Sequence, residues 1–211
     1  MKIKSVDPIH LDTLFKRIRI TFDMVIVSSM ALLIGFGAAY FYKGFQSDHL
    51  SRSLEKEIMY TKQASQIVDY YYRDGTCIRF QVAEEMIKAV DICLPQYFPK
   101  GPYTRKDFIA LALTETPNLD QYAVGTSGER GLFQIMNNMC NAFGITANHF
   151  DIRVNTELAM LVLRDKFEEH KDYRKALIAY NGLVIKNGRL SDKYWRRFSK
   201  YRKDVEIILG E

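Results

Sequence analysis

The most prominent hydrophobic pattern in the chain is an uncharged run near its N-terminus. Residues 24–42 read MVIVSSMALLIGFGAAYFY, nineteen positions without a charged side chain. As a helix this run would be roughly 28 Å long, close to the hydrocarbon thickness of a bilayer. It is longer than the apolar part of a cleavable signal peptide, and it ends in aromatic residues that are typical of a membrane interface. The pattern predicts a transmembrane signal anchor over 24–42, with a buried core helix as the alternative.

The charges around this run predict its orientation. Several basic residues precede it, whereas Lys43 alone follows it closely. The preceding ones are Lys2, Lys4, Lys16, Arg17 and Arg19. Because cytoplasmic segments beside a membrane span carry the excess of Lys and Arg, we expect residues 1–23 inside the cell and residues 43–211 outside the cytoplasmic membrane.

Beyond the anchor, apolar residues recur at intervals of mostly three to five positions, the spacing of amphipathic helices. The pattern predicts a long helix over 47–73, ended by Asp74-Gly75, and a second helix over 79–94. A loop is expected at 95–102, where three of the five prolines lie. Further helices are predicted at 104–115, 155–170, 173–181 and 191–208, the last capped by Ser191-Asp192.

Local signals define the helix that carries the candidate chemistry. Thr104 and Asp107 have the spacing of a capping box, and Pro117 must end the helix. Residues 118–134 are polar and glycine-punctuated, so a loop is expected there. We therefore expect a mainly α fold with at most a small β element. Its predicted parts are the cytoplasmic N-terminus (1–23), the anchor (24–42), a helical stalk with accessory helices (43–102) and a helical domain (103–211).

Composition and charge narrow the class of function. With 47% hydrophobic residues the chain can bury a core, which excludes a wholly disordered protein. Its 30 basic residues are interspersed with 25 acidic ones, unlike the clustered basic residues of nucleic-acid binders. The wide spacing of Cys77, Cys93 and Cys140, and four scattered histidines, predict no metal site. A Cys77–Cys93 disulfide stays open, with buried free thiols as the favoured alternative.

Glu115 is the candidate general acid. It ends an otherwise apolar helix, between Thr114 and Thr116 and just before the helix stop. Burial and the negative end of a helix dipole both raise the pKa of a carboxyl group. A carboxylic acid that stays protonated near neutral pH can donate a proton to a leaving group. The alternative is an acid at a helix end that faces solvent.

Three blocks of sequence resemble the SLT-type lytic transglycosylases, which are relatives of goose-type lysozymes. The blocks are Ala112-Leu-Thr-Glu-Thr116, Ser127-Gly-Glu-Arg-Gly-Leu-Phe-Gln-Ile-Met136 and Ala179-Tyr-Asn-Gly182. They follow the order of the family pattern: a helix ending in Glu-Ser, then Gly-x-x-Gly-Leu-x-Gln-(Ile/Leu)-Met, then Ala-Tyr-Asn. The resemblance covers about residues 103–185 and implies a lysozyme-like helical domain.

The resemblance implies roles for the matching residues. Glu115 corresponds to the single catalytic acid and base of the family. The substrate-binding positions that it implies are Thr116, Gly128, Gly131, Gln134, Tyr180 and Asn181. Core packing is the alternative for Tyr180. The sequence departs from the pattern at Thr116, where Ser is usual, and at Asn137, where Pro is usual, which bears on glycan preference rather than on the acid.

The activity implied is cleavage of the MurNAc-β-1,4-GlcNAc bond of peptidoglycan without water, leaving 1,6-anhydroMurNAc ends. An ordinary glycosidase needs a second carboxyl group, and the loop acids Asp120 and Glu129 have no supporting pattern. No metal or organic cofactor is implied.

The expected partners are glycan strands, the bilayer through 24–42, and a secretion, conjugation, flagellar or phage-entry apparatus; nucleic acid is not expected. The catalytic domain would lie in the periplasm or face the cell wall. Two alternatives stay open: a non-catalytic envelope or assembly component with a retained glycan-binding fold, and a hydrolytic goose-type muramidase.

Overall fold

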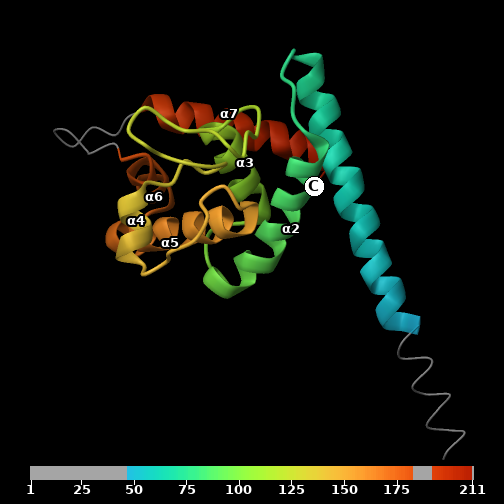
Figure 1. Ribbon diagram of the computed structural model, residues 1–211. Coiled ribbons are helices and arrows are strands. Elements are labelled where there is room, and N and C mark those ends of the chain that lie inside the picture. The colour runs from blue at the N-terminus through green and yellow to red at the C-terminus, as the bar shows by residue number, and fades with distance from the viewer. Residues whose placement is uncertain (1–46, 183–191, 211) are drawn as a thin grey trace, which may run out of the picture. The chain divides into compact units, whose positions relative to one another are not determined.

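The computed structural model describes residues 47–182 and 192–210. The chain divides into two compact units, Met1–Lys56 and Glu57–Glu211. In the first, the described residues 47–56 are helical with exposed side chains. In the second, this helix continues to residue 73. The labelled helices of the second unit are α2 (Phe80–Tyr97), α3 (Arg105–Glu115), α4 (Asn137–Ala142), α5 (Ile152–His170), α6 (Tyr173–Tyr180) and α7 (Asp192–Leu209) (Figure 1).

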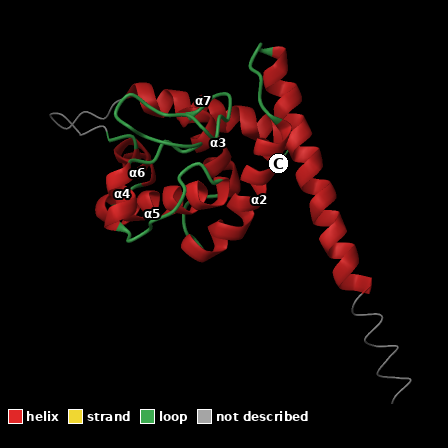
Figure 2. Cartoon of the chain, in the orientation of Figure 1, coloured by secondary structure: helices red, strands yellow, loops and turns green. Residues whose placement is uncertain are grey.

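The prediction of a mainly α fold is confirmed for the described residues. They contain helices and loops but no sheet (Figure 2). The small β element amounts to two isolated bridges, Val124–Arg130 and Arg130–Ile135. Both lie in the long loop between α3 and α4, where they fold the chain back on itself beside the end of α3.

Some predictions fall outside the described residues. They include the cytoplasmic N-terminus over 1–23, the membrane anchor over 24–42 and the helix cap at Ser191. Within the parts of the chain that the structure describes, no helix combines the length and the apolar character that a membrane span requires.

Helix α3 is the central element of the second unit. Its residues from Asp107 to Thr114 are all buried, so it has no solvent-facing side over that stretch. It packs against α7 and α2, while α5 packs against both α2 and α6. A helix that is apolar on every side is stable only inside a core. This central position brings the last residue of α3, Glu115, into the lining of a groove.

The start of α3 is fixed by a buried carboxylate. The predicted capping box is confirmed, because the Thr104 backbone N–H donates to Asp107 Oδ2 at 2.7 Å. The other oxygen of Asp107 accepts hydrogen bonds from Tyr173 Oη at 2.7 Å and from Arg202 Nε at 2.8 Å. Asp107 therefore joins α3 to α6 and α7, a role that its sequence spacing did not reveal.

The second half of the helix over 47–73 packs against the helical domain. Ala64, Ile67 and Tyr71 are buried in the core cluster. The hydroxyl groups of Tyr70 and Tyr71 donate to the carboxylate of Asp204 in α7, at 3.2 and 3.5 Å. From 64 to 71 this helix therefore lies against the helical domain.

Two helix boundaries differ by three residues from those predicted from sequence, and one short helix had no prediction. Helix α2 runs on through Pro95 to Tyr97, where the sequence indicated a loop. Helix α5 begins at Ile152 rather than 155, because the Asp151 side chain accepts from the Val154 N–H at 2.9 Å and caps it. The sequence does not predict helix α4, because its six residues are too few to show a periodic pattern.

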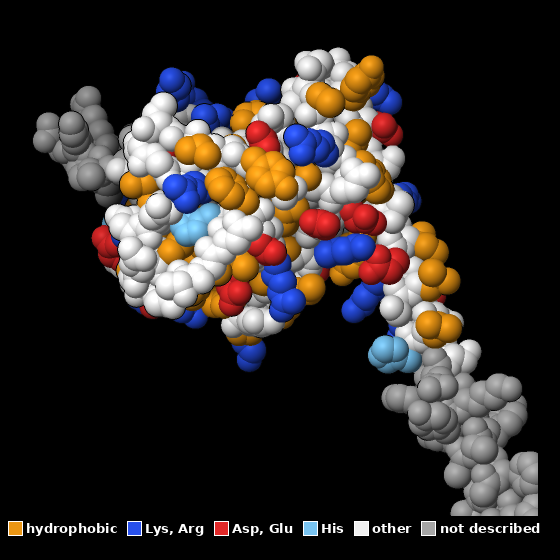
Figure 3. Space-filling view, viewed as in Figure 1, with side chains coloured by type: hydrophobic (Ala, Val, Ile, Leu, Met, Phe, Trp, Pro, Cys, Tyr) orange, Lys and Arg blue, Asp and Glu red, His pale blue; other side chains and the backbone are white. Residues whose placement is uncertain are grey.

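Side chains of both charges are mixed over the surface. On the face seen in Figure 3, acidic and basic groups lie among one another. One ion pair joins Lys88 and Glu57 at 2.6 Å. The three cysteines are free; Cys93 and Cys140 are buried, whereas Cys77 is exposed. The expectation of buried free thiols therefore holds for two of the three residues.

Candidate active site

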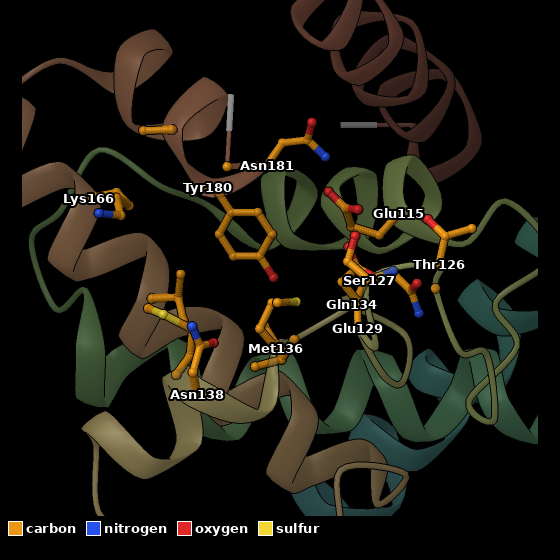
Figure 4. Close-up of a pocket in the computed structure, with 16 residues that line it drawn as sticks. Glu115, Thr126, Ser127, Glu129, Gln134, Met136, Asn138, Lys166, Tyr180 and Asn181 are labelled. Atoms are coloured by element: carbon orange, nitrogen blue, oxygen red, sulfur yellow. The ribbon is translucent and has the colours of Figure 1, made fainter. Parts of the chain in front are cut away.

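A groove of about 560 Å³ opens beside the C-terminal end of α3 (Figure 4). Four elements besides α3 contribute to it: the α3–α4 loop, the start of α4, one face of α5 and the end of α6. Its lining is Glu115, Gly125, Thr126, Ser127, Glu129, Gln134, Ile135, Met136, Asn138, Met139, Val162, Lys166, Ala179, Tyr180, Asn181 and Gly182.

The carboxyl group of Glu115 has the electrostatics of a general acid. Burial raises its pKa to about 6, while hydrogen bonds from Tyr194 and Asn181 and the charge of Arg197 lower it in part. The Tyr194 hydroxyl donates to Glu115 Oε1 at 2.5 Å. Since burial is the larger effect, about half of the Glu115 carboxyl groups stay protonated at pH 6, where an ordinary glutamate is ionised, and donors are in place to stabilise the carboxylate.

Two tyrosine hydroxyl groups make hydrogen bonds at Glu115 or close to it. Tyr180, at the end of α6, donates its hydroxyl to the backbone oxygen of Phe133 at 2.8 Å. Tyr194, near the start of α7, is buried and donates to Glu115 itself. Burial and the nearby charge of Glu115 raise the pKa of both phenols well above the ordinary value, so both remain hydrogen-bond donors.

The conformation of the α3–α4 loop depends on two residues for which the family resemblance implies substrate binding. Gln134 adopts a positive φ of 50°, and its side-chain nitrogen donates to the backbone oxygens of Gly131 at 2.8 Å and Ala123 at 3.3 Å. At Gly131, φ is 80° and a Cβ would lie 2.6 Å from the Asn155 side chain, so only glycine fits.

The predicted site residues fall into two groups. Gln134, Tyr180 and Asn181 line the groove together with Glu115. Thr116, Gly128 and Gly131 do not line it. The Thr116 hydroxyl is buried and donates to the backbone oxygen of Leu132 at 2.8 Å, so it ties the end of α3 to the loop. Gly128 has a φ of 92° in the turn between Gly125 and Glu129.

Sequence reasoning missed several residues of the site. Tyr194 and Arg197 lie three positions apart on α7, and the Arg197 guanidinium lies over the Tyr194 ring, 5.7 Å from its centroid. They come 79 residues or more after Glu115 and belong to none of the three blocks. Glu129 has no supporting pattern in the sequence, and in the structure it lines the groove.

The pKa of Glu115 predicts how activity depends on pH. A general acid must be protonated when substrate binds, so kcat/KM is expected to fall as pH rises through about 6. Initial rates of release of soluble fragments from cell walls, measured from pH 4 to 9, would check this. A profile that stays flat to pH 8 would contradict the assignment of Glu115 as the acid.

Comparison with known families agrees with this geometry. The transglycosylase SLT domain model matches residues 104–203. This range begins at the cap of α3 and includes the groove, Glu115, Tyr180 and Tyr194. No curated protein and no solved structure matches the chain. Residues 104–203 are a transglycosylase SLT domain.

Proposed function

We propose that this protein is a membrane-anchored lytic transglycosylase that cleaves the MurNAc-β-1,4-GlcNAc bond of peptidoglycan and leaves 1,6-anhydroMurNAc ends. An SLT domain indicates lytic transglycosylase activity on peptidoglycan. The observation that carries the proposal is the carboxyl group of Glu115, which lines the groove and has a pKa of about 6.

In the proposed reaction Glu115 acts twice. It first donates its proton to the glycosidic oxygen, and the acetamido group of the muramoyl sugar stabilises the cation that forms. The Glu115 carboxylate then takes the proton of the muramoyl 6-hydroxyl, whose oxygen bonds to the anomeric carbon. A pKa near the working pH suits a group that must both give and accept a proton.

The donors around Glu115 support the second half of this cycle. Tyr194 and Asn181 hydrogen-bond to the carboxylate and favour its charged form, and Arg197 adds a positive charge nearby. They come from α7 and α6, which meet beside the end of α3. We propose that Gln134, Tyr180 and Asn181 contact the glycan, and that Thr116, Gly128 and Gly131 act by shaping the loop.

Replacing Tyr194 by Phe tests the role of its hydroxyl. The variant keeps the buried ring and removes the donor that lowers the pKa of Glu115, so the descending limb of the pH profile should move to higher pH. Turnover should fall by about tenfold or more, since a hydrogen bond to a charged group contributes about 1.5–3 kcal/mol. A pH profile identical to the wild type would assign Tyr194 to packing alone.

The membrane anchor rests on the uncharged run over 24–42 and its basic flank. We propose that it holds the SLT domain against the outer face of the cytoplasmic membrane, where peptidoglycan lies. Such a tethered enzyme would open the cell wall for an envelope-spanning apparatus or would remodel the wall.

Replacing Leu33 by Arg tests the anchor. A charge at the centre of a spanning helix costs about 2.5–3.5 kcal/mol on insertion scales, so the variant should shift partly from the membrane to the soluble fraction. Leu33→Ile is the matched control and should stay in the membrane. Recovery of the uncleaved wild-type protein in the soluble fraction without detergent would refute the anchor.

Product analysis separates this proposal from its two alternatives. Full-length protein in mild detergent would digest purified cell walls, and the fragments would be identified by mass. Anhydro ends support the lytic transglycosylase, and reducing ends alone support the muramidase. The absence of fragments supports a non-catalytic envelope component.

A further inference from the structure

The groove contains a second carboxyl group that the proposed reaction does not use. Glu129 lines the groove with Glu115, and the two are close enough for the charge of Glu129 to raise the pKa of Glu115. In Figure 4 its side chain lies with Ser127 and Gln134 beside Glu115, whereas Lys166 lies on the other side of Tyr180.

The backbone of the loop holds this carboxylate in place. Glu129 Oε2 accepts the Ser127 N–H at 2.9 Å, and the Glu129 backbone oxygen accepts the Gly125 N–H at 2.7 Å. The tight turn is closed by the Gly128 N–H, which donates to the Gly125 oxygen at 3.2 Å. The side chain is therefore oriented by a hydrogen bond within its own loop.

A missing side chain lets two acceptors converge. A Cβ at position 125 would lie 2.3 Å from Glu129 Oε2 and 2.8 Å from Gln134 Oε1, so only glycine admits this arrangement. The nitrogen of the Gln134 amide donates to two backbone oxygens, which fixes its oxygen as the acceptor on this side. A carboxylate and an amide oxygen side by side suit a partner with two protons to donate, and water is the smallest such partner.

We propose that Glu129, with Gln134, positions and deprotonates a water molecule, so that the same site also hydrolyses a fraction of the bonds it cleaves. This inference rests on the proposed function, because it uses the cation that Glu115 generates. Two carboxyl groups, one as acid and one as base toward water, are what a hydrolytic glycosidase requires. The sequence pattern supplied only the first of them.

In the hydrolytic branch, Glu115 gives its proton to the leaving GlcNAc oxygen as the glycosidic bond breaks. The oxygen of water then bonds to the anomeric carbon of MurNAc, and the proton of that water passes to Glu129. Glu115 is left as a carboxylate and Glu129 as an acid, and exchange with solvent restores both. In the anhydro branch the 6-hydroxyl attacks instead, and its proton passes to Glu115.

Digestion of cell walls in ¹⁸O-labelled water tests the proposal. Full-length protein in mild detergent would cleave the walls, and borohydride reduction would follow at once. Mass spectrometry would count ¹⁸O-labelled reducing ends, formed by hydrolysis, against unlabelled anhydro ends. A parallel digest with Glu115→Gln measures label that enters pre-existing ends by exchange. The ratio of the two products is the readout because it does not depend on how much total activity a variant retains.

We expect the wild type to give both products, and Glu129→Gln to lower the ratio of labelled reducing ends to anhydro ends at least tenfold, since general base catalysis is typically worth about 10²–10⁴-fold. The matched control is Asp120→Asn, which removes a carboxylate of the same loop that does not line the groove and caps the Tyr122 N–H at 3.0 Å. Its ratio should equal that of the wild type.

Two results would overturn the inference: no labelled ends from the wild type, or an unchanged ratio in Glu129→Gln. Neither touches the proposed function, which fails instead if the wild type releases no anhydro ends or if Glu115→Gln still cleaves. The two proposals therefore stand or fall on different measurements.

Discussion

Glu115→Gln should abolish cleavage of peptidoglycan while leaving the fold intact. Glutamine keeps the shape of the side chain but can neither donate the proton to the leaving oxygen nor accept one afterwards. General acid–base catalysis is typically worth about 10²–10⁴-fold in rate. Because Glu115 serves as both the acid and the base, its loss should reach the upper part of that range. The measurement is the initial rate of fragment release at pH 6, with Glu168→Gln, an exposed residue of α5, as the matched control.

The same substitution should stabilise the protein at neutral pH. Because the folded-state pKa of Glu115 is raised, ionising this group opposes folding. The penalty is absent below the unfolded pKa of about 4.3 and grows as pH rises, reaching about 2 kcal/mol above the folded value of about 6. Urea denaturation at pH 4 and pH 7.5 should therefore show a gain for Glu115→Gln at the higher pH only. A loss of stability at both pH values would mean that the Glu115 side chain stabilises the fold.

Asp107→Ala should be the most destabilising single change at the start of α3. The side chain is 3% exposed and accepts hydrogen bonds from Thr104, Tyr173 and Arg202. Removing it leaves the part-buried donors of α6 and α7 without this acceptor. Breaking a buried ion pair typically costs about 3–5 kcal/mol, and because Arg202 is 33% exposed and also pairs with Glu206, we expect a loss near the lower end of that range.

The control for Asp107 is Asp172→Ala. Asp172 caps α6 by accepting the Lys175 N–H at 2.8 Å, but it is exposed and has no cation beside it in the described contacts. The loss of such a cap typically costs about 1 kcal/mol. Urea denaturation followed by circular dichroism should separate the two variants clearly. Equal losses would show that Asp107 acts only as a helix cap.

The position of the acid could be predicted from sequence because local signals decide it. The capping box at Thr104, the apolar stretch that follows and the stop at Pro117 fix α3, and its last residue is Glu115. The three blocks then identified Gln134, Tyr180 and Asn181, which line the groove. Local patterns did not predict α4, whose six residues are too few to show a period, or the continuation of α2 past Pro95.

The remaining site residues depend on packing that no local pattern encodes. Tyr194 reaches Glu115 only because α7 packs along α3, and its sequence separation of 79 residues hides that contact. Glu129 enters the groove because Gly125 leaves room for its carboxylate. Conversely, Thr116 carries a hydroxyl of the expected type, yet its burial turns that hydroxyl toward the Leu132 oxygen instead of the groove.

The most direct test of the central claim is the chemical nature of the ends formed by wild-type protein and by Glu115→Gln. Cell walls would be digested with each full-length protein, and the muropeptides separated and weighed by mass spectrometry. Wild-type protein should release 1,6-anhydroMurNAc ends, and Glu115→Gln, at equal folded concentration, should release none above background. Anhydro ends in equal yield from both proteins would contradict the assignment of Glu115 and the mechanism built on it.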